Sequence, residues 1–442
     1  MSGSAEQAGG AGTTSELRGF AWLFLQLAVI VTPLLITSDT IWKQCTVLAI
    51  AWTVHFFAPV RWKEPLWVAA CLAALVVLLG PATTGALVAM MILVYAIAAS
   101  PQPYWARVTE VAVLGAGIVV VATRFREALP FLPYGTYRVV GVLFAFRTFL
   151  YFYEIKGATG RPSLREFAAY FVFFPLWGHL LIPIVDFKRQ RDGFLVRPQR
   201  VIAQEGMRWV AVGVIQLMVY RMFLDDPIVD LHLPDPEHAQ GVVQILAMLA
   251  MLYAQYLLIS ASHHICVGMM HLFGYAMPPA HRNYALARSP IDLWRRVNIY
   301  WKDFLHTLVY LPAFFRLRRV GMFPAQVLAM LVVFFMSWIG HIWLYAWDAD
   351  LVWSDVPSTL IWHEGLFWLI FGVLCTIQMI VEERQRLRAK AQGRKGKPPP
   401  PPLWRRALVP LQVVAMFLLV GSLWLMLFSP SLAIWWETLT RF

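Results

Sequence analysis

The chain has 442 residues, of which 59% are hydrophobic and only 14% are charged. A soluble globular domain carries about 25% charged residues, so this composition excludes an ordinary soluble protein and predicts that most of the chain lies in lipid. The net charge of +12 does not indicate nucleic acid, because the Lys and Arg residues gather between apolar runs, as the positive-inside rule requires.

Apolar runs near the length needed to cross about 30 Å of hydrocarbon recur along the whole chain. They predict an all-α polytopic membrane protein with about 11–13 transmembrane helices plus re-entrant or interfacial helices. The runs lie at 20–36, 41–58, 65–80, 83–99, 107–123, 136–153, 167–187, 206–224, 240–262, 325–346, 359–381 and 406–427.

The charge of the loops predicts their sides of the membrane. Residues 188–200, 281–319 and 384–406 are rich in Lys and Arg, which predicts cytoplasmic loops, and the last of these also contains a proline run. Residues 225–238 and 348–355 carry acidic side chains without Lys or Arg, which predicts external loops.

Counting spans back from these loops places the N-terminal tail outside. It also places Arg61 and Lys63 outside, against the positive-inside rule. The predicted organisation has five parts: an external tail at 1–19, N-terminal transmembrane helices at 20–134, a core at 135–385, a basic and proline-rich cytoplasmic linker at 386–405, and a transmembrane helix with an external tail at 406–442.

A short apolar piece at 304–315 is flanked by basic residues on both sides. Both of its ends are therefore predicted to face the cytoplasm. About twelve residues are too few to cross and return, so the piece is predicted to be re-entrant or interfacial. Structure of that kind is tolerated where it is buried in protein or lines a wet cavity.

Residues 289–302 predict a charged helix between two spans. Ser289 at the N-cap, Pro290 and Asp292 form a helix start. On a continuous helix Trp294, Asn298, Trp301 and Leu305 would share one stripe, which places an amide on a hydrophobic face where it needs partners. The alternative is an amphipathic interfacial helix with snorkelling cations.

His341 lies within the apolar run 325–346, and Ser337 precedes it by one turn. A neutral imidazole in this setting can accept a proton from a hydroxyl group as a general base. The alternatives are that His341 is an interhelical hydrogen-bond donor, or that His363, at the start of the next run, is the base.

His263, His264 and His271 end the run before the charged helix. No cysteine or carboxylate accompanies them at ligand spacing, so they are predicted to line a substrate cavity, and no metal site is predicted. The four cysteines are scattered and form no CxxC pair.

Several stretches resemble the membrane-bound O-acyltransferase (MBOAT) family, especially its bacterial branch that modifies cell-envelope polysaccharides. The likeness covers roughly 135–385, which would be the catalytic core. It is carried by VGVLFAFRTFLYFYEI at 140–155, LREFAAYFVFFPLWGHLLIPI at 164–184, HHICVGMMHLFGYAMPPAHRNY at 263–284, SPIDLWRRVNIYWKDF at 289–304, SWIGH at 337–341 and Glu382-Glu383.

Two positions depart from the family pattern. The family's polysaccharide-modifying members usually have Trp-His-Gly at the histidine, where this chain has Gly340-His341-Ile342, and Val297 stands where Trp is common. The first departure leaves His363 open as the base. The resemblance implies a ring of spans around a central channel, with the donor entering from the cytoplasm and the acceptor from outside.

The resulting hypothesis is an inner-membrane, multi-pass O-acyltransferase with no bound cofactor. Its donor substrate is an acyl-CoA or acyl-carrier thioester, its acceptor is an external hydroxyl, and an extracytoplasmic partner protein completes the transfer. His341 and Asn298 are the predicted catalytic residues. The substrate channel is assigned to Trp294, Trp301, Ser337, His263 and His264, and donor binding to Arg295, Arg296, Lys302, Arg316, Arg318 and Arg319.

Two other classes fit the same sequence features. A transporter or flippase would use the same intramembrane polar groups to move a solute without a covalent step. A catalytically idle scaffold of an envelope-modifying complex is the third hypothesis.

Overall fold

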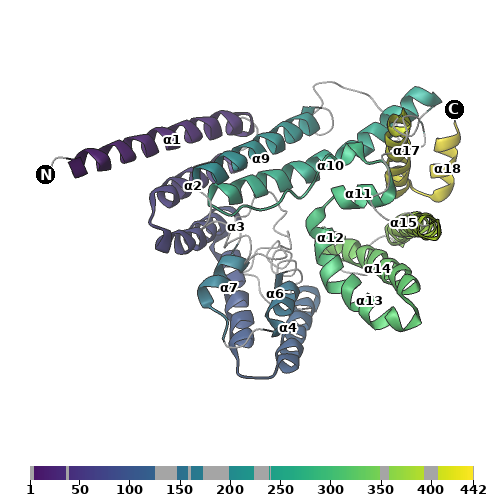
Figure 1. Cartoon of the computed structure of the whole chain (residues 1–442), viewed down its shortest axis with the longest axis horizontal. Coiled ribbons are helices and arrows are strands. Elements are labelled where there is room, and N and C mark those ends of the chain that lie inside the picture. The colour runs from purple at the N-terminus through teal and green to yellow at the C-terminus, as the bar shows by residue number, and fades with distance from the viewer. Residues whose placement is uncertain are drawn as a thin grey trace. The chain divides into compact units, whose positions relative to one another are not determined.

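The computed structural model describes residues 4–35, 39–124, 147–157, 161–172, 199–222, 238, 240–348, 358–392 and 407–441 (Figure 1). Within these ranges it contains 15 α-helices and no strand. Several predicted segments lie outside the described residues: much of the runs at 136–153 and 167–187, the loops at 188–198, 225–237 and 349–355, and the proline run at 398–402.

The chain divides into two compact units. The first comprises Met1–Arg221 and Leu257–Pro279, and the second comprises Met222–Tyr256 and Ala280–Phe442. The predicted core at 135–385 contributes residues to both units.

Each unit is built from helices. The first unit contains α1 (Ser4–Leu35), α2 (Asp39–Phe57), α3 (Val60–Ala99), α4 (Tyr104–Arg124), α6 (Phe149–Glu154), α7 (Leu164–Phe171), α9 (Gln199–Tyr220) and the second half of α10 (Gly241–Leu272). The second unit contains the first half of α10 with α11 (Pro290–Arg296), α12 (Ile299–Leu305), α13 (Leu311–Leu317), α14 (Met322–Asp348), α15 (Ser358–Ala391), α17 (Val409–Phe428) and α18 (Leu432–Thr440).

Seven helices in the described part of the chain are long and apolar enough to cross a membrane, which confirms the predicted all-α polytopic membrane fold. They are Glu16–Leu35, Leu79–Ala99, Tyr104–Val121, Gly241–Leu272, Met322–Trp343, Ser358–Ala391 and Val409–Phe428. A shorter apolar helix lies at Cys45–Phe57.

Helices α9 and α10 approach each other closely in the first unit. A Cβ at Gly206 would lie 2.6 Å from the Gly268 carbonyl oxygen, and a Cβ at Gly213 would lie 2.7 Å from the Ala261 carbonyl oxygen. Residue numbers rise along one helix as they fall along the other, so the two helices are antiparallel. Glycine is required at this crossing because no side chain fits between the backbones.

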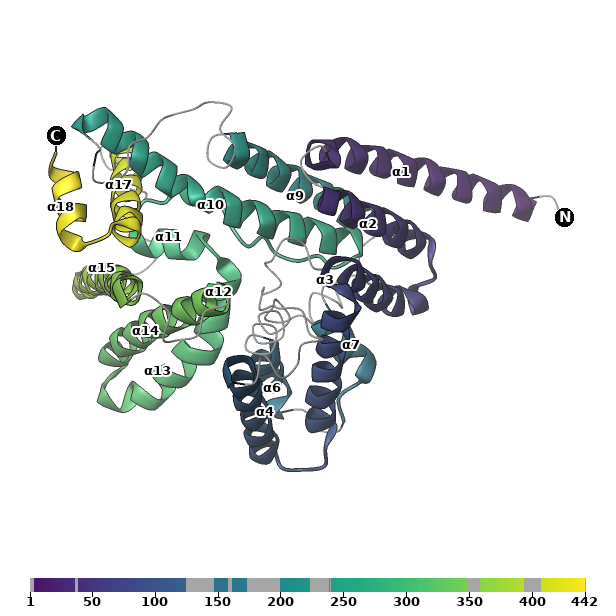
Figure 2. The same ribbon diagram turned by 180° about the vertical axis from the view of Figure 1, so that it is seen from behind.

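Helices α1 and α9 lie side by side and run parallel (Figures 1 and 2). Gly19 faces the Arg200 side chain, and Gln204 Nε2 donates a hydrogen bond of 3.0 Å to Gln26 Oε1. Residues 19 and 200 therefore lie at the same end of the unit.

The same end of the unit holds the beginning of α3, since Lys63 Nζ donates a hydrogen bond to Gln199 Oε1. Gly19, Lys63, Gln199 and Arg200 thus lie at one end of the first unit. The external placement of residues 1–19, Arg61 and Lys63 stays a prediction.

The core of the second unit is aromatic. Helices α14 and α15 run antiparallel, with Trp338 Nε1 donating to the Ile361 carbonyl at 3.1 Å and Gly372 facing Phe334. The buried side chains Phe334, Trp368 and Phe371 belong to one cluster, to which α11 and α17 also contribute. This packing supplies the rigid support for α11 and α12.

The start of α11 has the predicted cap. Ser289 Oγ accepts from the Asp292 N–H at 3.2 Å, and Arg296 Nε donates to Asp292 Oδ1 at 2.8 Å. Burial works to raise the pKa of Asp292, but hydrogen bonds from Arg296 and from the Arg288 N–H outweigh it and hold that pKa below its usual value. The ionised carboxylate therefore stabilises the fold at neutral pH, and this contribution is lost as the pH falls through the lowered pKa.

Gln378 of α15 fixes this cap from outside, because its Nε2 donates to Ser289 Oγ at 3.0 Å while its Oε1 accepts from the Ile291 N–H at 3.2 Å. Ser289→Ala removes an N-cap and leaves one Gln378 donor without this acceptor. We expect it to lower the free energy of unfolding by about 1–2 kcal/mol, measured by thermal unfolding in detergent.

The matched control is Ser422→Ala in α17, whose hydroxyl only bonds the Leu419 carbonyl of its own helix at 2.8 Å. Ser422→Ala should lower the free energy of unfolding clearly less than Ser289→Ala does. Equal losses for the two variants would contradict the capping role of Ser289.

Candidate active site

The chain breaks its helix at Val297 and Asn298, between α11 and α12. Asn298 has a left-handed backbone, with φ 40° and ψ 60°, and its Oδ1 accepts from the Trp301 N–H at 3.2 Å. Its own N–H lies 3.3 Å from His281 Nδ1. Asn298 is therefore the N-cap of α12, a position that asparagine suits because it tolerates left-handed geometry.

This break corrects the predicted continuous helix at 289–302. Since α11 ends at Arg296, Trp294 and Trp301 lie on different helices, and the stripe expected through Trp294, Asn298, Trp301 and Leu305 does not exist. Local hydrogen bonding outweighs the helical pattern here. The left-handed Asn298 turns the chain, and its side chain accepts a hydrogen bond from the first turn of α12.

Helix α12 continues into a longer helical arm. A π-helical turn at His306–Tyr310 joins it to α13, and a 3-10 turn at Arg318–Val320 follows. The chain reverses only at Gly321, whose φ is 111°, and α14 then runs back along α13 (Figure 1). The predicted piece at 304–315 is thus the middle of one arm of a helical hairpin.

The hairpin brings Trp301 against α14 near its far end. A Cβ at Gly340 would lie 2.9 Å from Trp301 Cη2 and Cζ2, so the indole ring occupies the space of a missing side chain. Trp301 lies 20 residues before Gly321 and Gly340 lies 19 after it, as expected for two arms of equal length.

His341 lies between two tryptophans. Its ring centroid is 4.7 Å from that of Trp368 on α15 and 6.4 Å from that of Trp301 on α12. Glu364, one turn before Trp368, interacts electrostatically with His341 and accepts a hydrogen bond of 2.9 Å from Trp368 Nε1. Helices α14 and α15 thus place an imidazole, a carboxylate and an indole N–H in one cluster, to which α12 adds the Trp301 ring.

Trp294 extends this cluster from α11. Its ring lies 5.9 Å from Trp368 and 5.2 Å from Phe334. The structure therefore brings together four of the predicted site residues, Asn298, Trp301, Trp294 and His341, although through a capped break and a hairpin and not through one helical stripe.

Ser337 and His363 flank the cluster. Ser337 is fully buried on α14 one turn before His341, and its hydroxyl has no hydrogen-bond partner among the residues that the structure describes. His363 is also buried and directly precedes Glu364 on α15. A buried hydroxyl is normally hydrogen-bonded, so Ser337 is a candidate for contact with a bound molecule.

His263 and His264 belong to the first unit, where each has a local bond. His263 Nδ1 is 2.6 Å from the Ile259 carbonyl oxygen, and His264 Nδ1 is 2.9 Å from Gln216 Oε1. These contacts give both residues a helix-packing role within α9 and α10. In the described ranges no group of three or more His, Cys, Asp or Glu side chains could hold a metal ion.

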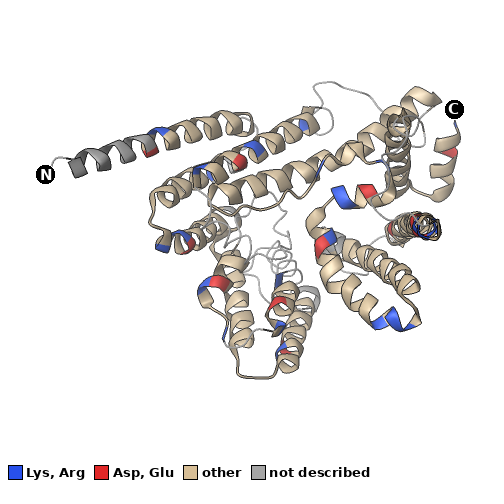
Figure 3. Cartoon of the chain, viewed as in Figure 1, with Lys and Arg blue, Asp and Glu red and all other residues tan. Residues whose placement is uncertain are grey.

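The six predicted donor-binding cations fall into two groups at opposite ends of the hairpin arm. Arg295, Arg296 and Lys302 lie near Asn298, whereas Arg316, Arg318 and Arg319 surround the turn at Gly321 (Figure 3). Lys302 and Arg316 are separated by about 20 Å, from the helical rise per residue. One phosphate group cannot contact both groups at once.

The sequence reasoning missed Trp368 and Glu364. An acidic residue within an apolar run was a usable signal, since ionisable groups in spans are costly and tend to be functional. Its spacing of four residues from Trp368 also places the two side chains on one face of a helix.

Neither the family models nor the curated proteins contain a match to this chain.

The close fit of Trp301 against Gly340 predicts a specific suppression. Gly340→Ala should destabilise the protein by about 1–3 kcal/mol and move the indole away from His341, because the added methyl group overlaps the ring. Trp301→Phe removes the overlapping ring atoms, so the double variant should recover much of the lost stability in thermal unfolding.

Gly117→Ala in α4 is the control, because nothing lies within 4 Å of a Cβ there. It should be neutral or slightly stabilising, as alanine favours a helix by up to about 1 kcal/mol. If Trp301→Phe and Gly340→Ala proved additive, the two residues would not be in contact.

Proposed function

We propose that this multi-pass membrane protein is an O-acyltransferase of the cytoplasmic membrane. It moves an acyl group, acetyl being the simplest, from a cytoplasmic thioester to a hydroxyl group of an envelope polysaccharide or a related external acceptor. The observation that carries the proposal is the placement of His341 between Trp301 and Trp368, beside Glu364. The resemblance of 289–304 and 337–341 to MBOAT motifs supports the same reaction class.

In the proposed reaction His341 accepts the proton of the acceptor hydroxyl while the oxygen forms a bond to the thioester carbonyl carbon. The tetrahedral intermediate then collapses, the C–S bond breaks, and the leaving thiolate takes the proton from the imidazolium. General-base action of this kind accounts for about 10²–10⁴-fold in rate.

Glu364 is a positioning residue in this proposal. Its carboxylate stabilises the transient imidazolium by charge, and its hydrogen bond with Trp368 Nε1 fixes the ring that packs on His341. The rings of Trp301 and Trp368 pack against the imidazole, and an apolar surrounding of this kind strengthens electrostatic effects.

The Asn298 amide has a capping role and a proposed catalytic role. Its Oδ1 is used by the Trp301 N–H, so only its NH₂ group is proposed to orient a reactant or donate to the developing oxyanion. One donor of this kind contributes about 3–4 kcal/mol in comparable sites.

The donor phosphates are proposed to bind at the hairpin turn. Arg296 pairs with Asp292, and Lys302 pairs with Asp303 at 2.7 Å, so both of these cations are already neutralised. Arg316, Arg318 and Arg319 are exposed and form no ion pair within the described residues. Three adjacent arginines suit the phosphates of coenzyme A or of a carrier-protein arm.

The first test is loss of thioester chemistry. Purified protein with radiolabelled acetyl-CoA should release CoA in the presence of an acceptor, and His341→Ala should lower this rate at least 100-fold because the base is lost. His363→Ala is the matched control, since it also removes a buried histidine from an adjacent span, and it should keep most of the activity.

Several outcomes would contradict this assignment. Loss of activity in His363→Ala but not in His341→Ala would make His363 the base. If the folded wild type released no thiol from any thioester donor but moved a solute in proteoliposomes, the transporter would be favoured. Unchanged envelope acylation in cells carrying His341→Ala would favour the scaffold.

The second test separates the two roles of Asn298. Asn298→Gly keeps the left-handed backbone and costs only a few tenths of a kcal/mol as an N-cap, yet it removes the amide. If the amide acts on the reactants, turnover should fall about 10²–10³-fold while the melting temperature changes little.

Asn298→Ala provides the comparison, because it disturbs both the backbone and the cap and should lower stability by about 1–2 kcal/mol. Full turnover in Asn298→Gly would show that Asn298 acts only as the cap of α12.

A further inference from the structure

The first unit contains a cavity of about 430 Å³, within the range of ligand-binding pockets. Its walls come from the end of α2, the start of α3, the start of α7 and the turn after α10. Half of its ten lining residues are charged, in a chain with 14% charged residues, and none of them belongs to the candidate active site.

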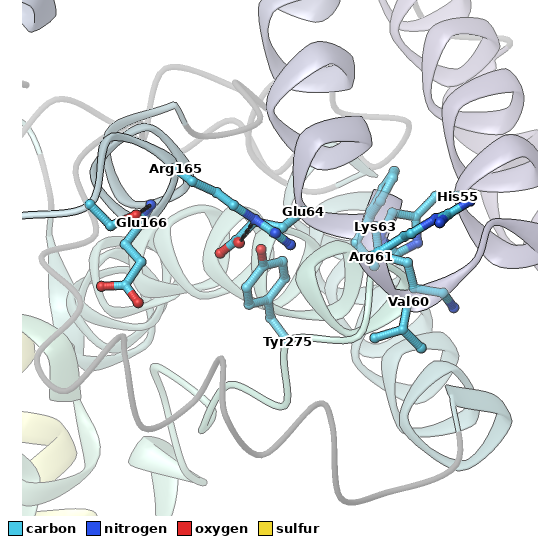
Figure 4. A pocket seen from close by; sticks show the side chains of 10 residues that line it. His55, Val60, Arg61, Lys63, Glu64, Arg165, Glu166 and Tyr275 are labelled. Atoms are coloured by element: carbon cyan, nitrogen blue, oxygen red, sulfur yellow. Dashed lines mark hydrogen bonds and ion pairs between the residues drawn. The ribbon is translucent and has the colours of Figure 1, made fainter.

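The charged side chains divide the cavity into two ends (Figure 4). Arg61 and Lys63 lie together with His55 at one end. Glu64 and Glu166 lie toward the other end, where Arg165 forms an ion pair with Glu64. The cavity therefore offers a basic end and an acidic end.

The basic end is formed by buried side chains that are held in place by their surroundings. Lys63 is 8% exposed, and its Nζ is held by Gln199 Oε1 and by the Phe56 carbonyl oxygen at 3.5 Å. Burial lowers the pKa of Lys63, and the charge of Glu16 opposes that shift, so a bound anion would further stabilise the ammonium. His55 is 1% exposed, and within the described residues its Nδ1 has no hydrogen-bond partner.

The cavity lies at the end of α10, which is long and apolar enough to cross a membrane and ends at Leu272. The shorter apolar helix Cys45–Phe57 ends beside the same cavity. Gln199, at the start of α9, donates from its Nε2 to the Leu272 carbonyl at 3.5 Å. Such ends mark the boundary between hydrocarbon and headgroups. A ligand at this level would meet the phosphate layer of the bilayer, and Val60 and Phe273 contribute apolar wall to the cavity.

We propose that this cavity binds the headgroup of a zwitterionic aminophospholipid of the phosphoethanolamine class. The phosphate lies against Arg61, Lys63 and the Nδ1 of His55, and the ammonium group lies toward Glu166. The site is separate from the proposed acyl transfer and does not rest on it.

The test uses purified full-length protein, delipidated in detergent, with native mass spectrometry as the readout. Phosphatidylethanolamine should bind in preference to phosphatidylglycerol and phosphatidylcholine. Arg61→Gln with Lys63→Gln should lower bound phosphatidylethanolamine at least tenfold. The control double variant Arg18→Gln with Lys43→Gln removes the same charge from exposed positions outside the cavity and should bind normally.

Two single variants keep the proposal testable if the buried Lys63 is needed for folding. Arg61→Gln changes only an exposed side chain and should still lower binding several-fold. Glu166→Gln should abolish the preference for phosphatidylethanolamine over phosphatidylglycerol while binding of lipid phosphate persists.

Equal lipid binding by the wild type and the Arg61 variants would overturn the proposal. Displacement of the lipid by millimolar inorganic phosphate, or binding of soluble O-phosphoethanolamine as strong as that of the lipid, would instead assign the cavity to a soluble anion. Unchanged headgroup preference in Glu166→Gln would remove the role of the acidic end.

Discussion

The packing of Trp301 into the space left by Gly340 is the contact on which the candidate site depends. It sets the register of the hairpin, and a shift of one residue between its arms would turn Trp301 away from His341. Two backbone positions make the contact possible. Asn298 starts α12 in a left-handed conformation, and Gly321 reverses the chain at φ 111°. The imidazole is therefore positioned by backbone geometry at both ends of one helical arm.

Several features could be predicted from the sequence because they follow from local chemistry. The Ser289 cap, the Asp292–Arg296 pair and the apolar helices depend on residues that are close in the chain. The proximity of Trp301 and His341 was expected from paired motifs, but by a continuous helix that the structure does not contain. The break at Asn298 could not be read from periodicity, since Val297 and Asn298 also fit a helical pattern and His281 helps to hold the turn.

The sidedness of the first third shows a different limit of sequence reasoning. Span counting accumulates error, because each missed or added crossing reverses every earlier segment. Tertiary contacts do not accumulate this error: Gly19 lies beside Arg200 and Lys63 is bonded to Gln199, which places these residues at one end of the first unit directly. If Gln199 and Arg200 face the cytoplasm, as the basic charge of 188–200 predicts, then Arg61 and Lys63 agree with the positive-inside rule.

The cost of placing charge in a membrane explains how this protein uses its few charged residues. An ion in hydrocarbon is expensive, so charges persist there only where partners or function retain them. Asp292 and Lys302 have local partners of opposite charge, which leaves them little capacity to bind a ligand. Glu364 has a neutral partner, the Trp368 indole, and interacts with a histidine whose charge depends on protonation. A carboxylate in that setting gains most when the imidazole becomes charged, and this would happen only during proton transfer. The energetic argument thus favours a residue that stabilises a transient state over one that only holds two helices together.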